Sequence, residues 1–134
     1  SLMPRGCSGK VRLDGNGLHP EIMLERGVGL STAAVESFKI VAFDLAALIL
    51  AVNGKASIPP FLIHDSPREA DLDADIYANL FDFVLGLEDK VNPTPFQYII
   101  TTTTAPSKKA LDHDALRLQL SSTPPDARLF AMDF

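Results

Sequence analysis

The chain has little cysteine, no excess of basic residues and no long uninterrupted apolar run. Cys7 is the single cysteine in 134 residues, which excludes an internal disulfide and favours a reducing compartment. Lys and Arg number 12 against 17 Asp and Glu, so a broad basic face for wrapping nucleic acid is excluded. The longest apolar run, residues 40–52, is interrupted by Asp44 and is too short to span a bilayer.

Two other absences bound the class of protein. No group of Cys and His has the spacing of a zinc site, and no segment has the pattern of a secretory signal. We therefore expect a cytoplasmic protein with no membrane partner. Residues 1–10 are rich in small and turn-forming residues, and Ser1-Leu2 resembles a cloning remnant, so we expect a tag or disordered leader there. Residues 11–134 are long enough for a single α/β domain.

Hydrophobic spacing predicts an alternation of helices and strands. The expected elements are strands at 11–13 and 18–24, a helix at 32–52, a strand at 61–64, a helix at 74–89, a strand at 96–103, a short helix at 107–112, and strands at 116–121 and 128–134 joined as a hairpin. Strands 61–64 and 96–103 are expected to lie parallel, with helix 74–89 as their crossover connection. Both are nearly continuous apolar runs, as in parallel sheets covered on both faces.

The most informative segment is residues 61–73, which reads FLIHDSPREADLD. Three apolar residues lead directly into four acids among turn-forming residues. A strand that ends in a carboxylate places that carboxylate at the carboxyl edge of a sheet, where open α/β folds bind their ligands. Asp65 at this edge is therefore a candidate ligand for Mg²⁺ on a phosphate.

Four segments in order resemble the C-terminal lobe of an ABC-type ATPase head of the SMC, RecN and RecF class. Leu30-Ser31 before the long helix resembles the signature motif, and residues 61–65 resemble the Walker B strand. Leu72-Asp73 resembles the D-loop, and residues 97–103 lie where the family has its switch strand. The resemblance covers residues 28–134. It implies a partial P-loop NTPase fold with a central, mainly parallel sheet, flanking helices and a C-terminal β-hairpin.

The resemblance also implies roles for individual residues. Asp65 would hold Mg²⁺ on the phosphates of ATP. Ser31, with Thr32 beside it, would bind the γ-phosphate of a nucleotide on a facing head, since a helix amino end attracts anions. Asp73 would lie at the seam between two heads. The implied partners are an N-terminal lobe carrying the Walker A loop, a second head in a homodimer, and DNA bound through the full-length protein.

Several positions depart from the family pattern. Ser66 occupies the place of the glutamate that polarises water, and a serine is a poor base at neutral pH. Glu69, three residues later, is a candidate replacement. Thr103 stands where the family has its switch histidine, and Thr32-Ala33 stands for Gly-Gly. The chain also lacks a Gly-x-x-x-x-Gly-Lys-[Ser/Thr] loop, so we expect half of a nucleotide site and no hydrolysis by this chain alone.

Other interpretations remain open. Ser66 and Thr103 favour a non-catalytic binding or scaffolding module that keeps the lobe and has lost hydrolysis. A metal-dependent hydrolase would use His64, Asp65, Asp71 and Asp73, but neighbouring strand residues point to opposite faces.

Single residues have simpler interpretations as well. Ser31 is also explained as a helix cap, Asp65 as a turn cap and His64 as a hydrogen-bonded core residue. Asp44, within the most apolar helix, faces either solvent or an N-terminal lobe.

Overall fold

The computed structural model describes residues 2–3, 5–26, 29–67, 72–90, 95–121, 123–124 and 127. Glu69, Asp71 and the predicted strand 128–134 lie outside the described residues. The elements, in order, are β1 (Cys7–Asp14), β2 (Gly17–Leu24), α1 (Thr32–Val52), β3 (Phe61–Asp65), α2 (Ala74–Glu88), β4 (Gln97–Thr101) and α3 (Lys108–Asp112). They form a small α/β protein with two separate two-stranded sheets.

Side-chain caps set the starts of both long helices. Ser31 is extended at its N-cap position and accepts a hydrogen bond from the N–H of Ala34 at 3.0 Å. Asp73 caps α2 by accepting from the N–H groups of Asp75 and Ile76. The predicted boundaries of α1 and α2 are confirmed to within one residue because these caps satisfy amide groups that a helix leaves free at its start.

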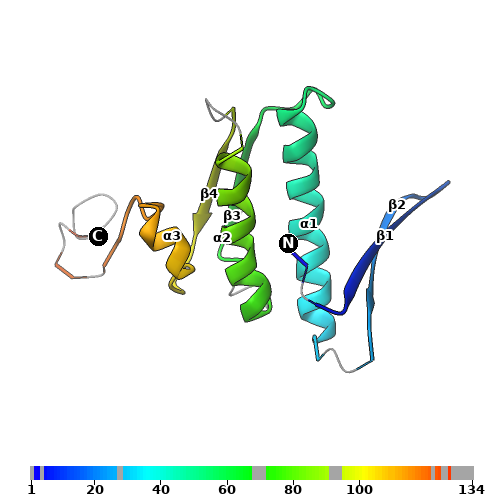
Figure 1. Cartoon of the computed structure of the whole chain (residues 1–134), viewed down its shortest axis with the longest axis horizontal. Coiled ribbons are helices and arrows are strands. Elements are labelled where there is room, and N and C mark those ends of the chain that lie inside the picture. Colours follow the sequence, from blue (N-terminus) through cyan, green and yellow to red (C-terminus); the bar gives the residue numbers. More distant parts are fainter. Residues whose placement is uncertain are drawn as a thin grey trace.

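The sheet of β3 and β4 is parallel, as predicted. Its register pairs Phe61 with Gln97 at one end and Asp65 with Thr101 at the other. Helix α2 is the crossover between the two strands. Both strands point to the end of the layer at which α1 and α2 begin (Figure 1). The carboxyl ends of the strands and the amino ends of the two helices therefore lie at the same end of the molecule.

The core lies between α1, α2 and one face of the β3–β4 sheet. Phe38 and Leu45 of α1 and Ile76 and Leu80 of α2 are almost completely buried. Alternate strand residues, namely Leu62, Tyr98 and Ile100, pack against this cluster. We call this the inner face of the sheet.

The other alternate residues form the outer face of the sheet. Phe61, Ile63 and Ile99 are 47%, 51% and 38% exposed on this face. The sequence predicted cover on both faces, but the described residues cover one. The central, mainly parallel sheet is thus reduced to a single parallel pair.

The predicted strand at 116–121 is wrong. Residues 115–121 carry no strand, and Leu116, Leu118 and Leu120 are all about half exposed or more. The alternation of leucines has the period of a strand, but no neighbouring strand among the described residues pairs with it. Period alone does not form a strand, because a strand also needs a partner for its backbone groups. The C-terminal hairpin is therefore not formed by the described residues.

The amino-terminal hairpin starts earlier than predicted. Strand β1 begins at Cys7 and pairs with β2 in antiparallel register as far as Asp14 opposite Gly17. Residues 7–10 therefore belong to a strand, and Leu2 is buried in the core at 9% exposure. The structure thus describes a strand within the segment 1–10, for which the sequence predicted a tag or disordered leader. The sequence signal was weak because Ser8-Gly9-Lys10 has no alternation of apolar residues.

Within the described residues, no helix is both long and apolar enough to cross a membrane. Helix α1 comes nearest in length, with 21 residues, but it carries Glu36, Lys39 and Asp44.

Two phenylalanines of α1 provide a direct test of the core. Phe38 is 1% exposed and Phe43 is 52% exposed. We expect Phe38→Ala to lower the free energy of unfolding by about 3–5 kcal/mol, because it removes buried surface and leaves a cavity. Phe43→Ala, the matched control on the same helix, should change it by about 1 kcal/mol or less. Urea denaturation followed by circular dichroism measures both, and equal losses would contradict this placement of the core.

Candidate functional site

The carboxyl ends of β3 and β4 bring Asp65, Ser66 and Thr101 together. Asp65 is paired directly with Thr101 in the parallel register. The Thr101 hydroxyl donates a short hydrogen bond to Asp65 Oδ1. The Ser66 hydroxyl reaches the same oxygen at 3.4 Å, and the Ser66 N–H donates to the Thr101 carbonyl oxygen at 2.9 Å. These three residues form a closed hydrogen-bonded group, which we call the strand-end cluster.

Ser66 has an unusual backbone conformation. Its φ of 48° lies in the left-handed region, which costs a non-glycine residue free energy. The hydrogen bond from its N–H to Thr101 holds the turn in place at the end of the sheet. Backbone conformations of this kind persist where surrounding bonds over-determine them. The backbone of Ser66 is therefore held at the end of the sheet.

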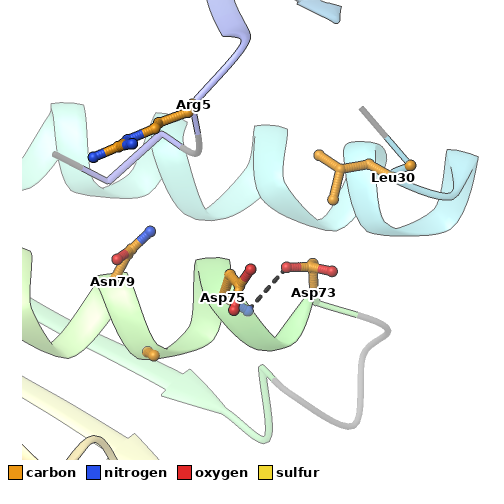
Figure 2. A pocket seen from close by; sticks show the side chains of 7 residues that line it. Arg5, Leu30, Asp73, Asp75 and Asn79 are labelled. Carbon is orange, nitrogen blue, oxygen red and sulfur yellow. Dashed lines mark hydrogen bonds between the residues drawn. The ribbon is translucent and has the colours of Figure 1, made fainter. Parts of the chain in front are cut away.

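A pocket of about 580 Å³ lies between the amino ends of α1 and α2. Figure 2 shows Arg5 and Leu30 on one side and Asp73, Asp75 and Asn79 of α2 on the other. The pocket has one cation and two carboxylates among its lining residues. Ser31 is not among them, and its hydroxyl accepts from Ala34 as a cap. Asp73 thus has the predicted place at the helix start, and it is a helix cap as well.

The predicted site residues fall into two groups. Asp65 and Ser66 lie in the strand-end cluster, and Asp65 is on the outer face of the sheet. Ser31, Thr32 and Asp73 lie at the helix starts, and α1 and α2 cover the inner face.

Over the part of the chain that the structure describes, no hydrogen bond joins Asp65 to the residues at the two helix starts. Within the described residues, the hydrogen bonds of the Asp65 carboxylate go to Ser66 and Thr101 rather than to either helix start.

Thr101, rather than the predicted site residue Thr103, is the threonine of this segment that contacts Asp65. Thr103 is exposed and lies two residues beyond the end of β4, whereas Thr101 contacts Asp65. The register of the parallel pair, with Phe61 opposite Gln97, places residues 65 and 101 side by side. Glu69, the candidate base, lies outside the described residues.

Asp44, His64 and Tyr98 form a second polar group on the inner face. His64 Nε2 is 3.1 Å from Asp44 Oδ2, and His64 Nδ1 is 2.6 Å from the Tyr98 hydroxyl. The three residues come from α1, β3 and β4, so the group ties the long helix to both strands. The interpretation of His64 as a hydrogen-bonded core residue is confirmed. Asp44 is 34% exposed at its side chain and is partnered by His64.

Burial raises the pKa of Tyr98 well above its ordinary value of 10.0, and the charge of Asp44 and the proximity of Tyr77 raise it further. The phenol therefore stays protonated at neutral pH and donates to His64 Nδ1. His64 Nε2–H then donates to the Asp44 carboxylate. With this tautomer both ring nitrogens of His64 have a partner, as polar atoms in an apolar layer require.

The strand-end cluster offers one carboxylate and two hydroxyl groups as possible oxygen ligands. Among the described residues, no group of three or more His, Cys, Asp or Glu could hold a metal. Magnesium is commonly held by one or two carboxylates together with substrate phosphates and water. Asp65, with the hydroxyls of Thr101 and Ser66, matches that pattern. A hydrolase that uses His64 and Asp65 on one metal is disfavoured, because His64 bonds to Asp44 and Tyr98 on the inner face.

The fold and the strand-end cluster define a small α/β protein with one carboxylate at the edge of a parallel strand pair. Residues 15–134 match the family described as "Uncharacterised protein conserved in bacteria (DUF2326)", and the chain belongs to this family. Comparisons with curated proteins and with solved structures give no match.

The raised pKa of Tyr98 predicts how stability depends on pH. A group whose pKa is higher in the folded state contributes stability that is complete below its unfolded pKa and is lost as pH rises above it. We expect the free energy of unfolding to fall above pH 10, by at most about 1.4 kcal/mol per pH unit from this phenol.

The variant Tyr98→Phe should remove this component, and Tyr77→Phe should reduce it only in part, because Tyr77 is the smallest of the three causes that raise the pKa of Tyr98. Urea denaturation at several pH values between about 8 and 11, chosen to bracket the ordinary tyrosine pKa of about 10, measures how steeply the free energy of unfolding changes with pH. An unchanged slope in Tyr98→Phe would show that another group titrates.

Proposed function

We propose that this chain is the C-terminal part of an ABC-type, SMC-like ATPase head that takes part in DNA repair or chromosome maintenance. It supplies the signature, Walker B, D-loop and switch-strand elements of a composite ATP site. One observation carries the proposal: Asp65 ends a parallel strand at the same end of the layer at which α1 and α2 begin. This is the arrangement that the order of the four sequence motifs requires.

Asp65 is the residue that would hold Mg²⁺, and bound ATP with Mg²⁺ would supply the phosphoryl group for hydrolysis. The Asp65 carboxylate bonds to Ser66 and Thr101, and the Ser31 hydroxyl caps α1, so the two residues belong to separate hydrogen-bonded groups, as the division of labour implied by the resemblance would have it. Asp65 acts on the nucleotide of its own head, whereas Ser31 and Thr32 act on the nucleotide of a facing head. Asp73 and Asp75 lie at the start of α2, where the seam between heads is expected.

The outer face of the β3–β4 sheet supports the presence of a further lobe. Parallel strands are normally covered on both faces, and Phe61, Ile63 and Ile99 are exposed here. An N-terminal lobe with a Walker A loop would supply the missing half of the nucleotide site. We place the assembled protein in the cytoplasm, with DNA as the partner of the full-length protein.

The second candidate is a non-catalytic binding or scaffolding module. Ser66 favours it, because this residue stands at the place of the water-polarising glutamate and its hydroxyl points to Asp65. A module of this kind would bind nucleotide or a partner without turnover. The alternatives differ in whether the product of the complete gene hydrolyses ATP.

The first test concerns Asp65. In the product of the complete gene, Asp65→Asn should lower Mg²⁺-dependent ATP hydrolysis by about 100-fold, because the amide cannot hold the cation as a carboxylate does. Glu88→Gln is the matched control, since Glu88 ends α2 and so lies at the opposite end of the layer.

Three results would contradict the ATPase proposal in this test. They are the absence of a Gly-x-x-x-x-Gly-Lys-[Ser/Thr] loop from the complete gene, full activity in Asp65→Asn, and ATP hydrolysis by residues 1–134 alone. A gene product that binds ATP without hydrolysing it would support the non-catalytic module.

The second test separates capping by Ser31 from phosphate binding. Aspartate caps a helix as well as serine does, so Ser31→Asp should change the free energy of unfolding by about 0.5 kcal/mol or less, whereas Ser31→Ala should cost about 1 kcal/mol. The aspartate places a negative charge where the γ-phosphate is expected, so ATP hydrolysis should fall steeply in Ser31→Asp. If the rate of ATP hydrolysis falls in Ser31→Ala and is kept in Ser31→Asp, in parallel with the free energy of unfolding, Ser31 acts only as a helix cap.

A further inference from the structure

We propose that Thr101 is a positioning residue for Asp65: its hydroxyl fixes the carboxylate on the outer face so that one oxygen is presented to a cation. This inference rests on the proposed function for the identity of that cation, magnesium held with a nucleotide. The contact itself rests on the geometry of the strand-end cluster. In this proposal Thr101 does not contact the phosphates. It affects cation binding by orienting the Asp65 carboxylate.

Both hydroxyl contacts of the Asp65 carboxylate end on the same oxygen. Thr101 Oγ1 and Ser66 Oγ donate to Oδ1, and within the described residues neither of these donors contacts Oδ2. A carboxylate held through one oxygen has a fixed plane and presents its other oxygen in a fixed direction. This favours a cation bound through the single oxygen Oδ2, which suits an ion that keeps several waters and phosphate oxygens.

Thr101 is better placed for this role than Ser66. The Thr101 hydroxyl donates directly to Oδ1 from the residue paired with Asp65 in the sheet, whereas the Ser66 hydroxyl lies at 3.4 Å, near the limit for a hydrogen bond. A threonine in a strand is also restricted in χ1, so its hydroxyl direction is set by the backbone. The backbone of Thr101 is itself held, because its carbonyl accepts the N–H of Ser66. The backbone of Thr101, which carries the donor hydroxyl, and the backbone next to Asp65, which carries the acceptor carboxylate, are thus held to each other by this bond.

The sheet is the reason that this contact exists. Parallel pairing puts the last residues of β3 and β4 in direct register and on the same face. A hydroxyl at residue 101 therefore reaches residue 65 without any loop rearrangement. Thr102 and Thr104 hydrogen-bond to Tyr77, and Thr103 lies beyond the strand. Among the four consecutive threonines, Thr101 is the one that contacts the carboxylate.

The first measurement tests positioning without any nucleotide. In purified residues 1–134, three-bond couplings to the Asp65 side-chain carboxyl carbon report how many χ1 rotamers it populates. We expect one rotamer in the unchanged chain and in Thr101→Ser, and averaged couplings in Thr101→Val. Thr101 is exposed and valine is a good strand former, so Thr101→Val should fold. Thr103→Val is the matched control and should leave the couplings unchanged.

The second measurement tests the consequence for cation binding. Mn²⁺ added alone to the same proteins should broaden the amide signals of residues 64–66 and 101. The Mn²⁺ concentration for half-maximal broadening should rise about 10-fold in Thr101→Val, as expected for loss of a partner that orients a metal ligand. Thr101→Ser and Thr103→Val should match the unchanged chain. In the complete gene product, Thr101→Val should raise the Mg²⁺ concentration for half-maximal ATP hydrolysis more than it lowers kcat.

The outcomes separate this inference from the proposed function. Averaged Asp65 couplings in the unchanged chain, or unaltered couplings and Mn²⁺ affinity in Thr101→Val, would overturn the role of Thr101 whatever the ATPase result. Couplings and Mn²⁺ affinity that change as expected would support the role of Thr101. If the complete gene product then shows no ATP hydrolysis, the proposed function fails and the positioning of Asp65 stands.

Discussion

The parallel pairing of β3 with β4 is the constraint on which the rest of the structure depends. It places Asp65 beside Thr101, and it requires the crossover helix α2, whose capped start carries Asp73. It also creates an inner face on which α1 packs and an outer face that stays open. In a parallel pair joined by a helix, the helix begins at the end of the sheet where the first strand finishes. The strand-end cluster and the start of α2 therefore lie at the same end of the layer.

The interface between α1 and the sheet combines apolar packing with one polar group. Phe38, Leu45 and Leu48 bury the helix, while Asp44 reaches across to His64 and so indirectly to Tyr98. A polar group in such a layer is costly unless its buried atoms have partners, and among the described residues no buried side-chain nitrogen or oxygen lacks one. Its contribution is therefore to fix the position of α1 along the strands rather than to add much stability.

Much of the fold follows from the sequence, and the failures have identifiable causes. Helix boundaries at Ser31 and Asp73 were predictable because cap residues act through bonds to their own helix. The parallel pair was predictable because β3 and β4 are apolar runs separated by a helix. The strand at 116–121 was not, since its leucines have the right period but no strand among the described residues pairs with them. The contact of Thr101 with Asp65 was missed because it depends on register, which periodicity does not specify. Family membership, which covers residues 15–134, adds no chemistry to this account.

The crossover connection between β3 and β4 has a consequence for how the chain folds. The paired residues Asp65 and Thr101 are separated by 36 positions along the chain, whereas the β1–β2 hairpin closes over a two-residue turn. Pairing across a long connection must first overcome the entropy of closing that loop, so it is slow relative to local pairing. The hairpin and both helices are therefore able to form early, and the strand pair completes last. The strand-end cluster then assembles only when the whole α/β layer is in place, which couples its formation to the completion of folding.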